Sequence, residues 1–188
     1  DLTLNAGAGA LTLSGSVGAG NQIGAIDIDA GSLTQDGAIT AQGQVDIDVA
    51  AALTIDENLT SGGATNITVT ADDAGAATFS HTAGTISSTA GALTIRADDM
   101  ALSGTITATD QVVHLLSNTA SDSWEIGGDG TTANELELTE AELETISTGA
   151  SGILRIGTTA ATSGSISAAI DDLTNVQTLT LSAATITD

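Results

Sequence analysis

The chain has 188 residues, a formal net charge of −22, no cysteine, no proline and 1% aromatic residues. Because it has neither cysteine nor lysine, it cannot be cross-linked by disulfides or by lysine-derived isopeptide bonds. A surface this negative repels nucleic acids and anionic lipids, so we expect neither as a partner. No apolar run approaches the roughly 18 residues of a membrane-spanning helix, so we also expect no membrane insertion.

Isoleucine recurs along most of the chain at a near-constant spacing of about 20 residues. A fixed period of this size is typical of a solenoid, in which each repeat stacks on the one before it. We expect these side chains to stack as one column in the core: Ile28, Ile47, Ile67, Ile86, Ile106, Ile126, Ile146, Ile166 and Ile186.

Further apolar columns run between the isoleucines. The second recurs at multiples of the same period and contains Leu13, Leu33, Leu53, Leu93, Val113, Ile153 and Leu173. The third is looser and contains Ile39, Leu59, Phe79, Leu138 and Leu179. The three columns follow one another along the chain at short, similar steps, as from Leu33 to Ile39 to Ile47, which indicates three sides per coil.

Within each side the pattern alternates, as in Thr105-Ile106-Thr107, and a period of two indicates a strand. Pairs such as Gly62-Gly63 and Gly127-Gly128 supply turn residues at the corners. We therefore predict an all-β fold, a parallel β-helix of about nine coils with about 20 residues and three short strands per coil. It would form a single unit over residues 1–188.

One stretch departs from the strand pattern. Thr139-Glu140-Ala141-Glu142 has the spacing of a helix capping box, which predicts a short helix near residues 139–147. The alternative is an ordinary coil, because Ile126, Ile146 and Ile166 keep the regular period across this stretch.

The repeat pattern extends to both ends, from Leu2 and Leu4 to Ile186. An uncapped coil leaves a sheet edge that another strand can pair with. We therefore expect neighbouring repeats in a longer array, or end-to-end association with copies of the same chain.

Acidic residues gather at several places. Asp27, Asp29, Asp46 and Asp48 flank successive isoleucines, which predicts four carboxylates on one exposed patch. Arg96 is expected to form a surface ion pair with Asp98 or Asp99. Oxygen-rich turns can bind Ca²⁺ loosely, and the alternative is that these aspartates only form turns. The residues considered as calcium ligands are Asp72, Asp73, Asp98, Asp99 and Asp129.

Other candidate chemistry has little support in the sequence. His81 and His114 are far apart along the chain and lack a third ligand at metal-binding spacing, so we expect them at the surface or at corners. Trp124 is expected to pack over a corner or inside the coil. A cleft lined by paired acids and aromatic residues, as in glycosidases, is not evident, so we expect no enzymatic activity and no catalytic residue or organic cofactor.

A ladder of hydroxyl side chains flanks part of the isoleucine column: Thr85/Ser87, Thr105/Thr107, Thr145/Ser147, Ser165/Ser167 and Thr185/Thr187. Such a Thr-x-Thr ladder resembles the flat face of β-solenoid ice-binding proteins. The alternative is the ordinary surface of exposed parallel strands, which also favours threonine.

Two groups of segments carry a resemblance to known proteins. Gly31–Thr40, Gly91–Ile95 and Leu102–Ile106 resemble repeats of filamentous haemagglutinin-type bacterial surface proteins. Leu138–Ile146, followed by Leu154–Gly157, resembles an element of very large bacterial β-strand-repeat exoproteins. The resemblance implies a right-handed β-helix, an extracellular or cell-surface location and a role in adhesion or surface structure. It provides no catalytic residues.

These observations together favour a non-catalytic structural protein, an adhesin stalk or cell-surface filament subunit. The alternatives are a self-assembling sheath or fibre protein and a binding face for ice or glycan. The expected partners are neighbouring repeats, further copies of the chain, other surface proteins or glycans.

Overall fold

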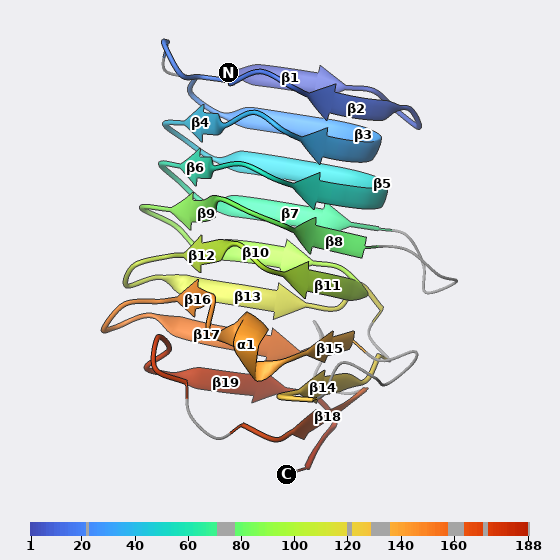
Figure 1. Cartoon of the computed structure of the whole chain (residues 1–188), viewed down its shortest axis with the longest axis vertical. Helices are drawn as coiled ribbons and strands as arrows, with labels where there is room; N and C mark the ends of the chain where they lie inside the picture. Colours follow the sequence, from blue (N-terminus) through green and yellow to red (C-terminus); the bar gives the residue numbers. More distant parts are fainter. Residues whose placement is uncertain are drawn as a thin grey trace.

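The computed structural model describes residues 1–21, 23–70, 78–119, 122–128, 136–157, 164–170 and 173–187. The fold is almost entirely β, and the strand pairs in the described residues are parallel. The strands lie across the long axis and stack along it, with the two termini at opposite ends (Figure 1). This architecture is compatible with a β-solenoid and agrees with the all-β prediction.

The longest stack, here called the first ladder, has eight strands in the order in which the chain forms them. They are β1 (Leu2–Asn5), β3 (Ile26–Gln35), β5 (Val45–Ile55), β7 (Thr65–Val69), β10 (Leu93–Arg96), β13 (Val112–Leu116), β17 (Ile153–Gly157) and β19 (Leu179–Ser182).

The second ladder shares two of these strands. β3 and β5 are long enough to continue around a corner, and a register shift between Ala30 and Ser32 marks the bend. Their C-terminal halves pair with β2 (Ala10–Leu13) and β8 (Thr78–His81), and β8 pairs with β11 (Asp99–Leu102).

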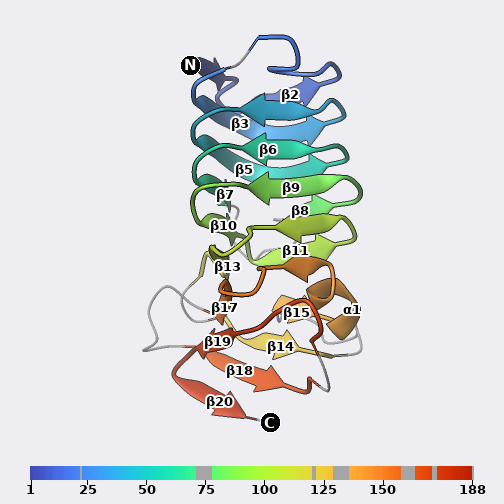
Figure 2. The ribbon, with the colours of Figure 1, turned by 90° about the vertical axis from the view of Figure 1, so that its left-hand side faces the viewer.

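Two further ladders complete the stack (Figure 2). The third ladder contains β4 (Ile39–Ala41), β6 (Leu59–Ser61), β9 (Thr85–Ser88), β12 (Thr105–Thr107) and β16 (Ile146–Ser147). The fourth ladder has the order β15 (Leu136–Leu138), β14 (Trp124–Ile126), β18 (Ser165–Ala168) and β20 (Thr185–Thr187). β15 packs next to β11. As a result β14, which comes before β15 in the sequence, lies farther along the axis than β15 (Figure 1).

The core is a single cluster of apolar side chains that alternate inward along the strands. In the first ladder one file of buried residues runs through consecutive strands: Ile28, Ile47, Ile67, Ile95, Leu115 and Ile156. Each member is covered by the members above and below it, so the apolar surface is removed from water along the axis.

The single isoleucine column predicted from the period is wrong. Ile28, Ile47 and Ile67 stack in the first ladder, but Ile86 and Ile106 stack in the third. The remaining members divide as follows: Ile146 pairs with Ile106 in the third ladder, and Ile126, Ile166 and Ile186 belong to the fourth.

The reason is a change in coil length. From Ile47 the chain reaches its next neighbour in the ladder, Ile67, after one sequence period, but from Ile67 the next neighbour is Ile95, well beyond one period. The extra length of chain equals about one side of a coil, so the next isoleucine, Ile86, falls on a different side. The sequence period therefore continues while the spatial column changes.

The second predicted column is divided as well: Leu33 and Leu53 stack in the second ladder, Leu93 and Val113 stack in the first, and Leu13 lies opposite Gln35. Burial of the predicted core residues follows this arrangement. In the first two predicted columns most members are buried, whereas Leu13 and Leu173 are half-buried against the core. Ile153 is half-buried as well, because its neighbour Leu154 is the residue that lies opposite Val113. Ile186 is 51% exposed, on the last strand of the fourth ladder.

The helix α1 (Glu140–Leu143) lies within the predicted stretch but is shorter, since Ile146 already belongs to β16. The capping box is present: the Glu142 backbone N–H donates to Thr139 Oγ1, and the Thr139 backbone N–H donates to Glu142 Oε2 at 2.9 Å. Glu142 Oε1 also accepts from the backbone N–H of Leu102 on β11 at 3.0 Å. The cap therefore joins the helix to the second ladder.

Candidate functional site

The outer surface of the first ladder carries the most organised set of charges in the described chain. Strand alternation turns every second side chain outward, and parallel pairing aligns those side chains along the axis. Asp27 lies opposite Asp46, and Asp29 lies opposite Asp48. The predicted patch of four carboxylates is therefore confirmed, and we call these four residues the acidic patch.

The four carboxylates repel one another. Partial burial is the main cause that raises the pKa of Asp46, and the charges of Asp48, Asp27 and Asp29 add to it. A hydrogen bond from Gln44 Nε2 to Asp46 Oδ2, 3.3 Å long, acts in the opposite direction. The patch therefore favours a cation or a cationic surface as its neighbour.

Farther along the same surface lie both arginines of the chain. The outward positions of β10, β13 and β17 align Thr94 with His114 and His114 with Arg155, while Arg96 occupies the next outward position on β10. We call Arg96, His114 and Arg155 the basic patch, and its positive charge comes from the two arginines. Burial lowers the pKa of His114, and the positive charge of Arg155 lowers it further.

Neither arginine has a carboxylate partner among the residues that the structure describes. Arg96 Nη1 donates instead to the backbone carbonyl of Ser117 over 3.4 Å. The predicted ion pair between Arg96 and Asp98 or Asp99 is therefore wrong. Asp98 is engaged elsewhere, because its carboxylate accepts from the backbone N–H of Asn118 at 2.6 Å and from both the N–H and Oγ1 of Thr119.

The calcium candidates do not come together in the described residues. Asp72, Asp73 and Asp129 lie outside them. Asp98 closes a loop through its three hydrogen bonds, and Asp99 is exposed on β11. Across the described part of the chain, no three His, Cys, Asp or Glu residues form a group that could hold a metal ion.

Hydroxyl side chains occupy a different surface from the charges. On the outside of the third ladder, pairing aligns one file of Thr40, Thr60, Ser87, Thr107 and Ser147. Asp27/Asp29 and Asp46/Asp48, which flank the first two isoleucines in place of hydroxyl pairs, belong to the first ladder. Ser165/Ser167 and Thr185/Thr187 belong to the fourth. The third ladder therefore has a continuous file of hydroxyl side chains. It contains fewer of the predicted Thr/Ser pairs than the sequence suggested, because two of those pairs lie on the fourth ladder.

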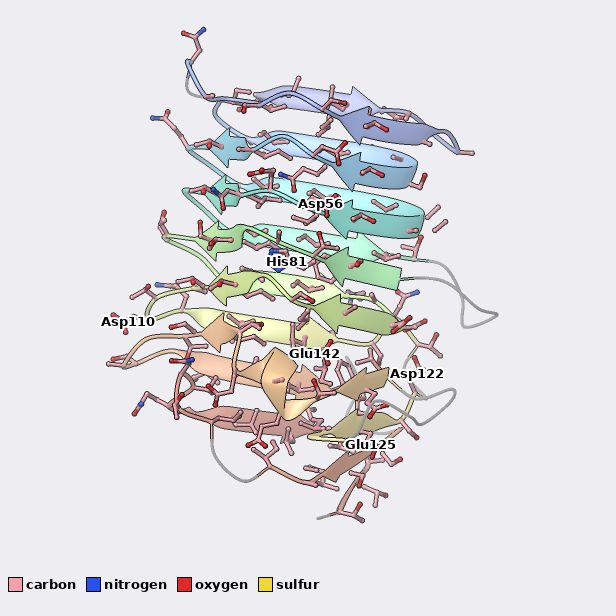
Figure 3. All side chains as sticks on the ribbon, viewed as in Figure 1. Asp56, His81, Asp110, Asp122, Glu125 and Glu142 are labelled. Atoms are coloured by element: carbon pink, nitrogen blue, oxygen red, sulfur yellow. The ribbon has the colours of Figure 1, made fainter. Side chains whose placement is uncertain are left out.

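His81 and Trp124 lie in the interior. His81 is fully buried (Figure 3), in contrast to the expectation of a surface or corner position. Neither ring nitrogen makes a hydrogen bond of ordinary length and angle to a described residue. Burial lowers its pKa to about 4, partly opposed by the backbone of Ala83. Trp124 is 1% exposed, as one of its two predicted placements requires.

The sequence contained a signal for the position of His81. Phe79 and His81 are two residues apart on β8, so strand alternation turns both to the same side. Since Phe79 pairs with Leu53 and belongs to the core, His81 is directed inward as well.

Comparisons with known proteins identify no relative: no family model matches the chain, and neither the curated proteins nor the solved structures contain a match. In the described residues, no helix has the length and apolar character needed to cross a membrane. The class defined by the fold is an almost all-β protein with long parallel sheets.

Proposed function

We propose that this chain is a non-catalytic, extracellular structural segment, an adhesin stalk or cell-surface filament subunit built as a right-handed parallel β-helix. About nine coils of three strands at roughly 4.8 Å per coil would span about 40–45 Å. The main support is the run of parallel ladders over one apolar core, from β1 to β19. Force along the axis would load many backbone hydrogen bonds and stacked side chains together.

Axial continuation is part of this proposal. Among the described strands, β1 and β19 end the first ladder, and each pairs with one neighbour in it. Their outer edges have backbone groups that a further repeat or a second copy could pair with. Neighbouring repeats in a longer array, or end-to-end copies in a sheath or fibre, would satisfy these groups.

Electron microscopy of the isolated chain, with and without millimolar Ca²⁺, tests this proposal. The expected particles are straight rods of about 40–45 Å or end-to-end multiples of that length. Elongation only with Ca²⁺ would support a role for the aspartates as calcium ligands between copies. Compact, roughly spherical particles under both conditions would contradict the structural role.

The hydroxyl file of the third ladder favours one alternative, a binding face for ice or glycan. Its five members repeat at coil spacing on one surface. If the face binds ice, micromolar protein will shape growing ice crystals, and Thr60→Glu will weaken this effect because a charged, bulkier side chain breaks the flat file. The matched control is Thr54→Glu on the second ladder. Unshaped crystals with the wild-type protein would contradict ice binding.

A further inference from the structure

The outer surface of the first ladder has opposite charges at separate levels along the axis. The acidic patch lies on β3 and β5, and the basic patch on β10, β13 and β17. Between them β7 presents Asn66 and Thr68, which are uncharged. The surface is therefore negative toward the N-terminal end of the ladder and positive toward its C-terminal end.

Both patches lack a counter-charge of their own. The acidic patch raises the pKa of Asp46 through mutual repulsion in addition to burial. In a chain with 24 acidic residues and two arginines, neither arginine reaches a carboxylate within the described residues. Unpaired charges of both signs on one surface indicate a partner that carries the same two charges in the opposite order.

A second copy of this chain has that distribution. We propose that the outer surface of the first ladder binds the same surface of a second copy, with the two stacks antiparallel. This lateral contact goes beyond the proposed axial function and is independent of it. Antiparallel docking places each acidic patch against a basic patch, whereas parallel docking places acid against acid.

The register of the strands determines which residues would meet. The two-fold axis of such a dimer lies in the interface, parallel to the strands, so each outward file faces its own copy. With the axis at β7, Asp48 faces Arg96. With the axis between β7 and β10, Asp27 faces Arg155. Each arrangement pairs an aspartate with an arginine twice, once on each side of the two-fold axis, while His114, whose pKa is lowered, faces an aspartate as a neutral ring. The two arrangements differ by a shift of about one coil.

The size of the surface indicates a weak, reversible contact. Eight strands about 4.8 Å apart and about five residues wide give roughly 600 Å² per copy, near the low end for protein interfaces. The net charge of −22 on each copy opposes the approach. Because the Debye length is about 8 Å at physiological ionic strength and about 3 Å at 1 M, moderate salt screens the long-range repulsion, while high salt also weakens the contacts. Dimerisation should therefore be strongest at intermediate salt.

Sedimentation velocity over a range of concentrations and salt tests the inference with two charge-reversal variants. Asp27→Arg with Asp48→Arg makes the surface mainly basic, and Arg96→Glu with Arg155→Glu makes it wholly acidic. Each variant alone is expected to dimerise at least tenfold more weakly than the wild type. An equimolar mixture of the two is expected to recover a dimer that contains one copy of each.

Glu57→Arg with Asp99→Arg is the matched control, since it makes the same change in net charge as the first variant at exposed positions outside the first ladder. This variant is expected to dimerise as the wild type does, and far-ultraviolet circular dichroism verifies the fold of every variant. A wild type that stays monomeric at all salt concentrations overturns the inference. A mixture that fails to associate, or variants that dimerise normally, overturns it too. Side-by-side dimers sediment as a more compact species than end-to-end dimers, which separates this contact from axial assembly.

Discussion

Replacing Ile106 by alanine is expected to lower the free energy of unfolding by about 2–5 kcal/mol. Ile106 is fully buried on β12 and lies between Ile86 and Ile146 in the third ladder. Shortening its side chain leaves a cavity that these two neighbours cannot fill without shifting their own strands. Urea denaturation followed by circular dichroism measures the loss.

The same substitution at Ile186 is the matched control. This residue has an equivalent place in the sequence period, but it is 51% exposed on β20. Its loss is expected to change stability by no more than about 0.5 kcal/mol. Equal losses of unfolding free energy at Ile106 and Ile186 would contradict the burial pattern. The place of an isoleucine in the sequence period, and not its burial, would then determine how much it stabilises the fold.

His81 is expected to make the protein sensitive to acid. In the unfolded chain its pKa is about 6.5, whereas burial lowers the pKa to about 4 in the folded state. The unfolded state therefore binds a proton first, and stability falls as the pH drops from 6.5 toward 4. The full loss of stability from this group is about 3 kcal/mol, and it is reached when the pH is below the folded-state pKa.

His81→Leu tests this effect. Leucine suits this position in the core, because His81 lies between Ile55 and Leu102 in the second ladder. The substitution also removes two buried ring nitrogens that make no ordinary hydrogen bond to a described residue. We expect the variant to gain about 1–2 kcal/mol at pH 7. Its advantage over the wild type should grow between pH 6.5 and 4.

The difference between the two proteins is the relevant quantity, because protonation of the many carboxylates relieves repulsion and stabilises both at low pH. His114→Leu is the control, since His114 is half-buried on the outer surface of the first ladder. It should retain most of the acid sensitivity. A constant difference between wild type and His81→Leu over this pH range would contradict the burial of His81 as a neutral ring.

The candidate site was only partly foreseen. Asp27 and Asp46 stand one coil apart in a regular part of the sequence, so their adjacency was predictable, and so was that of Asp29 and Asp48. The basic patch was not predictable, because Arg96 and Arg155 are far apart in the sequence and lie on strands separated by β13. The intervening chain forms β14 and β15 on the fourth ladder, and the sequence period contains no sign of that detour.

The sequence by itself determined the local structure of this protein. Alternation specified strands, the absence of proline suits ladders that need every backbone N–H, and the box at Thr139 and Glu142 specified the helix start. Each of these depends on residues a few positions apart. Tertiary structure alone decided which isoleucines stack, how β14 and β15 are ordered, and that both arginines share a surface with four aspartates. The physical reason is that stacking depends on the length of chain between coils, and each coil of a different length moves the residues that follow it to another face.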